Sequence, residues 1–134
     1  MKVKAYTDLE QSKKLAEILP LESADYHYIT QKEKSYFYPY SLSSDAIKDY
    51  DEEIKYIPCW SLAALLNILH SKAKDIPSLS GGGYKDGKYI SDWCLDYEFE
   101  NGDYQKTFAS NSIDACYKMI IRLIEQKYLR YGES

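Results

Sequence analysis

The feature that most constrains the fold is a strict alternation of apolar and polar side chains in the second half of the chain. Every second residue from position 93 to 99 is large and apolar, namely Trp93, Leu95, Tyr97 and Phe99. A period of two is typical of a strand with one face in a core, because successive side chains of a strand point to opposite faces. Residues 93–99 are therefore predicted to form a half-buried β-strand.

The pair Asn101-Gly102 predicts how this strand turns. It is a strong signal for a two-residue type I′ turn, which joins antiparallel strands. Residues 103–109 would then form the partner strand. That register also places Glu100 opposite Asp103, and like charges in this position are unfavourable. A shifted or longer turn is therefore an open alternative.

The N-terminal part of the chain predicts a helix followed by a hairpin. Thr7 and Glu10 have the spacing of a capping box, and Pro20 would end the helix. Residues 25–30 and 35–42 are both strand-like and are joined by a short polar stretch. This arrangement is typical of a β-hairpin.

The centre of the sequence predicts a buried helix. It follows residues 43–57, which are acidic and aperiodic and are interpreted as an exposed connection. The helix would begin at Pro58, a favourable residue for a first helical turn. Apolar side chains surround nearly the whole circumference of residues 59–69, as in a helix in the middle of a core. Residues 71–83 contain a proline and three consecutive glycines and are predicted to form a loop.

Two further elements complete the predicted order. Asp86-Gly87 is a turn signal, so a small hairpin is predicted within residues 84–90. A third helix is predicted over residues 113–130, capped by Asn111 or Ser112 and with one polar and one apolar face.

These elements predict an α+β fold, with an antiparallel sheet built from hairpins and three helices mainly on one face. Hairpins dominate, and no segment is typical of a parallel crossover connection. The sequence has 134 residues, of which 45% are hydrophobic and 28% charged. This length and composition are ordinary for one globular domain, so residues 1–134 are predicted to form a single domain.

Composition also indicates where the chain works and what it binds. The first residues carry no apolar targeting segment, and the longest apolar run is about half the length that a bilayer requires. A cytoplasmic protein without a membrane partner is therefore expected. The three cysteines include no CxxC pair, which favours free buried thiols and predicts neither a metal site nor a cofactor. The net charge is −4 and the basic residues are scattered, so nucleic acid is not an expected partner.

Three segments in order carry a resemblance to a family. They are AYTDLEQSKKLAEILPLESAD near the start, IPCWSLAALLNIL in the centre and IDACYKMIIRLIE towards the end. The chain resembles a family of short uncharacterised proteins encoded in the genomes of gut anaerobes and their mobile elements. The resemblance implies a bacterial or phage protein of the cytoplasm, and it implies no activity or functional residue.

Tyrosine supplies the candidate binding residues. The chain has 15 tyrosines, and strand periodicity would bring five of them to one face of the first hairpin: Tyr26, Tyr28, Tyr36, Tyr38 and Tyr40. One interpretation is that this face is core, with the hydroxyl groups at its margin. The other is an exposed aromatic platform for contacts with a protein or a carbohydrate. Base stacking is a third use, which the absence of a basic surface disfavours.

A catalytic alternative rests on Cys59-Trp60 at the predicted start of the central helix. The helix dipole at such a position lowers the pKa of a cysteine and favours a nucleophilic thiolate. His70 would lie about 16 Å away along the same helix, and His27 precedes the cysteine in the chain. The favoured interpretation is thus a buried, unreactive thiol. The sequence predicts a small protein-binding or regulatory module without catalytic activity, such as an accessory or immunity factor of a mobile element, with a thiol-dependent hydrolase as the alternative.

Overall fold

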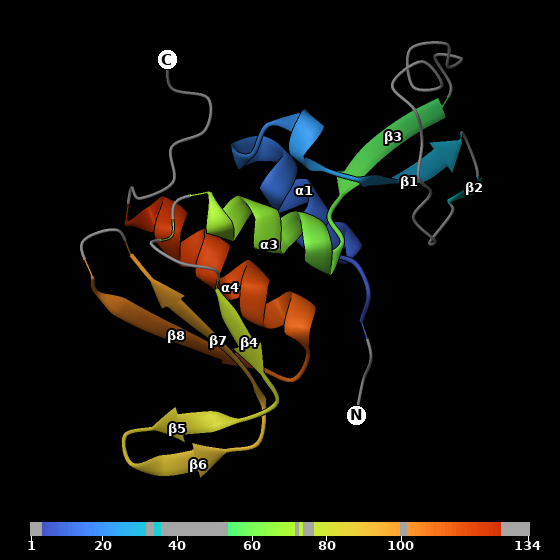
Figure 1. Ribbon diagram of the computed structural model, residues 1–134. Coiled ribbons are helices and arrows are strands. Elements are labelled where there is room, and N and C mark those ends of the chain that lie inside the picture. The colour runs from blue at the N-terminus through green and yellow to red at the C-terminus, as the bar shows by residue number, and fades with distance from the viewer. Residues whose placement is uncertain are drawn as a thin grey trace. The chain divides into compact units, whose positions relative to one another are not determined.

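The computed structural model describes residues 4–31, 34–35, 54–71, 73, 77–99 and 102–126. The chain divides into two compact units. We call Tyr6–Ala64 with Tyr131–Ser134 the N-terminal unit, and Met1–Ala5 with Leu65–Arg130 the C-terminal unit. The single domain stays a prediction. The elements shown in Figure 1 are α1 (Leu9–Ile18), a 3₁₀ turn (Leu21–Ser23), β1 (Tyr26–Gln31), β2 (Lys34–Ser35), β3 (Ile54–Cys59), α3 (Leu62–His70), β4 (Ser78–Ser80), β5 (Gly83–Lys85), β6 (Lys88–Ile90), β7 (Trp93–Glu98), β8 (Tyr104–Ala109) and α4 (Ser112–Glu125).

The first helix begins with a capping box one residue later than predicted. The Asp8 side chain accepts a hydrogen bond from the Gln11 N–H (2.8 Å), and the Gln11 side chain accepts one from the Asp8 N–H (3.1 Å). Both partners are polar and lie at the surface. The predicted pair of Thr7 and Glu10 is wrong, because Thr7 is fully buried and its hydroxyl bonds elsewhere.

Thr7 is the centre of a buried hydrogen-bond network in the N-terminal unit. Its hydroxyl accepts from the Trp60 N–H (3.1 Å) and lies 2.8 Å from the Ser12 hydroxyl. Its carbonyl accepts from the Tyr28 hydroxyl (2.7 Å), and its own N–H donates to the Trp60 carbonyl (3.0 Å). One residue therefore connects the start of α1 to β1 and to the end of β3.

The sheet of the N-terminal unit has the order β2-β1-β3, with antiparallel pairing. β1 and β2 form the predicted hairpin as far as Ser35, which pairs with Thr30. The prediction of an exposed connection is wrong for residues 54–57, which form most of β3. Pro58 is also in this strand, opposite His27, and not in a helix. A proline is tolerated here because β3 is an edge strand of the described sheet.

The central helix, α3, begins at Leu62, four residues after the predicted start. Ser61 precedes it, and its hydroxyl accepts from the Ala64 N–H (3.3 Å). The predicted helix began too early because apolar residues at its start fit a buried strand as well as a buried helix. Leu65 and Leu69 are fully buried, as predicted. Leu62 and Leu66 are only half-buried and Ala63 is exposed, so the helix is not buried around its whole circumference.

The sheet of the C-terminal unit has the order β4-β7-β8, and β7 and β8 form the predicted antiparallel hairpin. The register differs by one residue from that of a two-residue turn, which would set Leu95 opposite Phe108. Leu95 instead pairs with Thr107. The Phe99 N–H donates to the Asp103 carbonyl (2.8 Å), so the turn is one residue longer. Gly102 takes the positive φ (+93°) that this longer turn needs.

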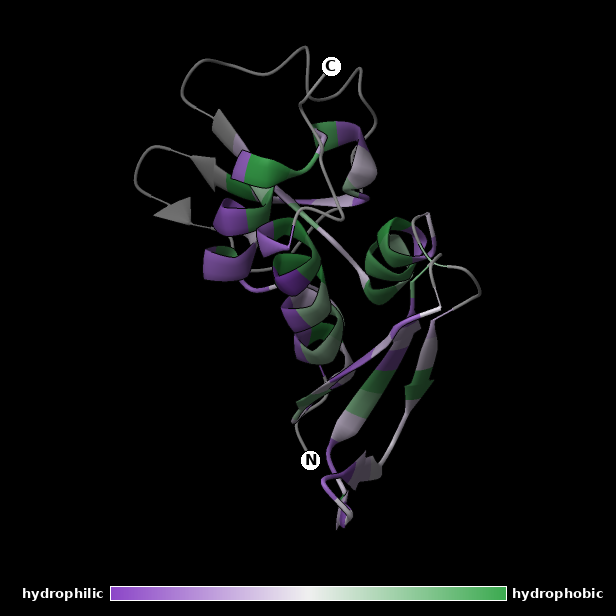
Figure 2. Cartoon of the chain, turned by 90° about the vertical axis from the view of Figure 1, so that its left-hand side faces the viewer, coloured by the Kyte–Doolittle hydropathy of each residue, from purple (hydrophilic) through white to green (hydrophobic). Residues whose placement is uncertain are grey.

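The shifted register decides which side chains of the hairpin are buried, because a slip of one residue moves every side chain to the other face. Leu95 and Tyr97 are fully buried on one face, and hydrophobic bands interrupt the strands of this sheet in Figure 2. Thr107 shares that face, and its hydroxyl donates to the Ala115 carbonyl of α4 (2.7 Å). Phe108 is left on the opposite face.

α4 packs on β7 and β8, and Asn111 caps it as predicted by accepting from the Asp114 N–H (2.8 Å). The helix spans Ser112–Glu125, and residues 127–130 of the predicted helix lie outside the described residues. β4 is a strand within the segment that was predicted to be a loop. Its three residues have no strand pattern of their own, and the strand forms because it pairs with β7. That part of the loop prediction is wrong.

The small hairpin predicted at Asp86-Gly87 is confirmed as β5 and β6. Both turn residues have positive φ (+52° and +79°), as a type I′ turn requires. At its base the backbone of Gly83 lies against Cys94 and Phe108: a Cβ placed there would be 2.9 Å from the Cys94 sulfur. This hairpin therefore covers part of the sheet face opposite α4.

The fold class is α+β, as the sequence predicted, with three α-helices and antiparallel strand pairing among the described residues. The described strands form three separate sheets and not the one sheet that was predicted. No helical segment in this part of the chain combines the length and the apolar character that crossing a bilayer requires.

Candidate functional site

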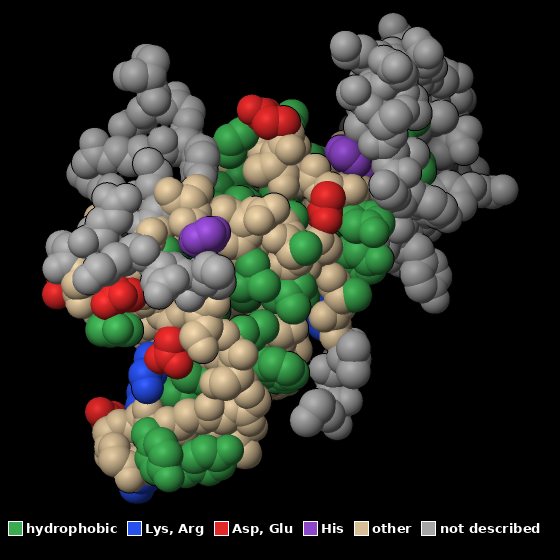
Figure 3. Space-filling model, viewed as in Figure 1, with side chains coloured by type: hydrophobic (Ala, Val, Ile, Leu, Met, Phe, Trp, Pro, Cys, Tyr) green, Lys and Arg blue, Asp and Glu red, His purple; other side chains and the backbone are tan. Residues whose placement is uncertain are grey.

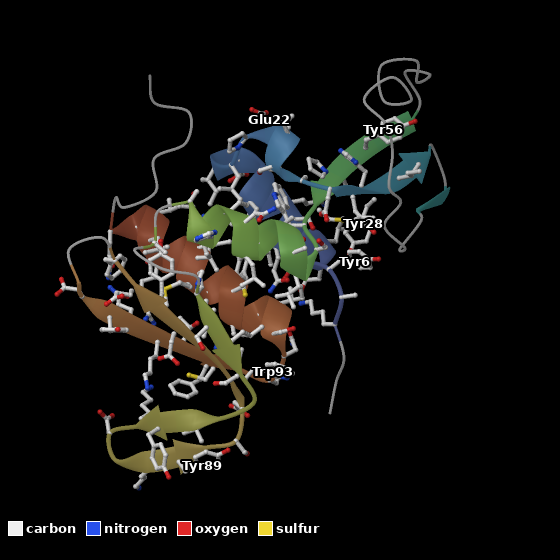
Figure 4. All side chains as sticks on the ribbon, viewed as in Figure 1. Tyr6, Glu22, Tyr28, Tyr56, Tyr89 and Trp93 are labelled. Atoms are coloured by element: carbon white, nitrogen blue, oxygen red, sulfur yellow. The ribbon has the colours of Figure 1, made fainter. Side chains whose placement is uncertain are left out.

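Of the two described tyrosines of the predicted platform, one is buried in the N-terminal unit and the other is half-buried. Tyr28 is 8% exposed, and its hydroxyl is bonded to the Thr7 carbonyl. Tyr26 is half-buried, and its ring makes an edge contact with Tyr6 at 4.7 Å between centroids. Figure 4 shows Tyr6 and Tyr28 close together below β1. The other members of the platform, Tyr36, Tyr38 and Tyr40, lie outside the described residues. A binding role for the five tyrosines stays a prediction.

Cys59 is not at a helix N-terminus, and this part of the catalytic alternative is wrong. The residue ends strand β3, is fully buried, and pairs with Tyr26. His27 pairs with Pro58, so its side chain points to the opposite face of the sheet from that of Cys59. Burial raises the pKa of Cys59 to about 12, and the nearby Asp25 carboxylate adds to the shift. A protonated thiol is a poor nucleophile.

The other cysteines have similar surroundings. Cys94 and Cys116 are buried, and burial raises the pKa of each thiol, to about 12 for Cys116. Among the described residues, no group of three or more His, Cys, Asp or Glu side chains could hold a metal ion.

A basic pocket of about 510 Å³ opens in the C-terminal unit, beside the β5–β6 hairpin. Three elements line it: β5 with its turn, strand β8 and helix α4. Its lining residues are Tyr84, Lys85, Asp86, Lys106, Thr107, Phe108, Lys118 and Arg122. Four of them are cationic and one is anionic. Figure 3 shows Lys and Arg side chains next to this hairpin.

Two of the cations come from α4 and are fixed against the open edge of β8. Lys118 and Arg122 are four residues apart, so they lie on one face of the helix. Lys118 donates to the Phe108 carbonyl (2.8 Å). Arg122 donates to the Lys106 carbonyl (3.0 Å) and to the Gln105 side chain (3.3 Å) through the same nitrogen, Nη1. These bonds hold both charges at the wall of the pocket.

The other two cations are on strands. Lys106 lies 3.5 Å from Asp96, directly across β7 and β8, and both side chains are partly exposed. Lys85 is exposed, and it stands opposite Lys88 on β6. Like charges directly opposite each other disfavour the hairpin.

Aromatic side chains form the apolar part of the pocket. Phe108 lies against the backbone of Gly83, and Tyr84 is 65% exposed at the rim. The ring of Tyr84 makes an edge contact with Tyr89 at 5.4 Å between centroids. Tyr89, labelled in Figure 4, lies over Gly82, where an added Cβ would collide with its hydroxyl.

The sequence did not predict this pocket, because its cations are far apart in the chain and alternate with acidic residues. A partial signal was present: Lys118 and Arg122 have helical spacing on the polar face of the last predicted helix. The contribution of Lys85 and Lys106 depends on how the two hairpins fold over each other, which no local pattern encodes.

Comparisons of the chain with models of protein families, with curated proteins and with solved structures found no match. The family resemblance therefore stays a prediction, and the basic pocket is the feature that supports a function.

Proposed function

We propose that this protein is a small binding module without catalytic activity, and that its ligand is an anion held in the basic pocket. The observation that carries the proposal is the convergence of four cations on one open pocket: Lys85, Lys106, Lys118 and Arg122. In this proposal, the regulatory role expected from the sequence depends on ligand binding at this site.

The size and composition of the pocket support a small ligand. Its volume of about 510 Å³ is within the range of roughly 300–1,000 Å³ that is usual for small-molecule sites. Such sites combine apolar walls with a few convergent polar groups, and Tyr84 and Phe108 supply walls of this kind. Asp86 is the one anionic side chain among the lining residues, and it is exposed at the tip of a turn.

The chemistry of the thiols favours binding over nucleophilic catalysis. Each cysteine is buried, and burial raises its pKa, so the thiolate form is disfavoured near neutral pH. This supports the non-catalytic half of the proposal.

Calorimetric titration with tripolyphosphate tests the proposal, because this probe carries several charges and no apolar group. We expect saturable binding that weakens with added salt, since salt screens exposed charges. Lys85→Gln should weaken it about tenfold, or about 1.4 kcal/mol, near the lower end for a hydrogen bond to a charged group.

Lys88→Gln is the matched control, because Lys88 faces Lys85 across the same hairpin but does not line the pocket. It should change the affinity by less than about twofold, a difference of under roughly 0.5 kcal/mol. The absence of saturable binding, or an equal loss in both variants, would contradict the proposal.

A further inference from the structure

We propose that the anion is a free nucleotide, with its phosphates on the cations of β8 and α4 and its base on the ring of Tyr84. This inference rests on the proposed function and names the ligand class of the same pocket. Three features support it: the number of charges, the donors at the edge of β8, and the position of an exposed aromatic ring.

The charge of the lining residues suits a polyanion. The lining residues, four cations and Asp86, have a formal net charge of +3, or +2 when Asp96, the ion-pair partner of Lys106, is included. A single carboxylate would leave part of this charge uncompensated. A nucleoside diphosphate or triphosphate carries several negative charges in a row. The planar guanidinium of Arg122 also suits phosphate, because it can offer two parallel hydrogen bonds.

Hydrogen-bond donors are present at the edge of β8. Lys118 uses one of its three ammonium donors on the Phe108 carbonyl, and Arg122 uses Nη1 on β8. In an antiparallel strand the N–H and the carbonyl of a residue point to the same side. The Lys106 and Phe108 carbonyls accept bonds from α4, so the N–H groups of these two residues also face the open edge. Backbone N–H groups beside cations are well suited to bind phosphate oxygens.

The aromatic ring is placed where a base can reach it. Tyr84 is exposed at the rim of the pocket that the cations line, and its ring makes an edge contact with the ring of Tyr89. Tyr89 is itself positioned over Gly82. Nucleobases stack on exposed aromatic rings of this kind without strong preference for one base. A base on Tyr84 would lie at the rim of the pocket, while the phosphates would reach the cations of its walls.

The test compares three probes on the full chain without added divalent cations: ATP, tripolyphosphate and adenosine. ATP should bind at least about fivefold more tightly than tripolyphosphate, the fold-change that corresponds to a stacking contribution of roughly 1 kcal/mol. Adenosine, which has no charge, should bind far more weakly than either. Lys85→Gln should weaken ATP and tripolyphosphate together.

Variants of Tyr84 separate the base from the phosphates. Tyr84→Ala should weaken ATP about fivefold or more, for the same stacking contribution, and leave tripolyphosphate unchanged. Tyr84→Phe, which keeps the ring, should bind ATP like the natural chain. Tyr104→Ala is the control for a generally exposed tyrosine, because Tyr104 is 66% exposed but does not line the pocket.

The outcomes distinguish the two proposals. If no anion binds, the proposed function is wrong. If tripolyphosphate binds as tightly as ATP, or Tyr84→Ala weakens both probes equally, the pocket is an anion site and the nucleotide inference is wrong. A short single-stranded oligonucleotide that binds more tightly than ATP would overturn the inference of a free nucleotide in favour of nucleic acid.

Discussion

The network around Thr7 gives the sharpest prediction about stability. Thr7→Val keeps the shape of the side chain and removes its hydroxyl. The Trp60 N–H would then lose its acceptor at a site where both residues are fully buried. The Ser12 hydroxyl would keep only the Thr7 carbonyl, at 3.4 Å. The substitution therefore tests hydrogen bonding with packing held nearly constant.

The magnitude follows from the buried N–H. Leaving one buried donor unsatisfied costs roughly 1–3 kcal/mol. Thr7→Ser is the matched control, since it keeps the hydroxyl and loses one methyl group, which costs about 0.8 kcal/mol. For a chain of this length each kcal/mol lowers the melting temperature by about 4 °C. We thus expect a decrease of about 4–12 °C for Thr7→Val and about 3 °C for Thr7→Ser.

Urea unfolding followed by tryptophan fluorescence, with thermal unfolding by circular dichroism, measures both variants. If Thr7→Ser loses more stability than Thr7→Val, the methyl group matters more than the hydroxyl. The hydrogen-bond network would then not have the role that we assign to it.

Two further predictions concern titratable groups. In the native protein near neutral pH, iodoacetamide should modify no cysteine, and in guanidinium chloride it should modify all three; modification of Cys59 in the native state, detected by mass spectrometry, would contradict the buried thiol. Burial lowers the pKa of His27, and Asp25 opposes this only in part. The unfolded chain therefore binds more protons than the folded chain, so stability should fall as the pH decreases below about 6.5. His27→Gln should flatten this dependence; an unchanged slope in this variant would refute the role of His27.

Local sequence patterns correctly predicted the elements whose conformation depends on neighbouring residues. The period of two at 93–99, the Asp86-Gly87 turn and the Asn111 cap all describe short-range structure, and each is confirmed. Patterning alone did not set the register of β7 and β8, because the alternation on β8 is compatible with both registers. The longer turn resolves this choice, since Gly102 supplies the positive φ that it needs.

Long-range pairing explains the predictions that were wrong. Residues 54–59 become a strand because β1, more than twenty residues earlier in the chain, pairs along their whole length. Their own composition allowed a connection followed by a helix. The short strand β4 likewise depends on β7.

The candidate site could not be predicted for a related reason. Its cations come from two hairpins and a helix, and they become a group only when these elements fold together. The tyrosines gave a stronger sequence signal, yet Tyr28 serves the core of the N-terminal unit. An abundance of one residue type indicates neither burial nor binding until the fold shows which of those side chains face the core and which face the surface.

The most direct test of the central claim, that the basic pocket binds an anion, is a titration of isotope-labelled protein with tripolyphosphate followed by amide NMR. If the pocket binds the anion, the shifts should saturate and be largest at Lys85, Lys106 and Phe108, where the pocket meets the hairpin and the edge of β8. The amides of β1, in the other unit, should change little. Largest shifts outside the pocket, or shifts that do not saturate, would contradict this claim.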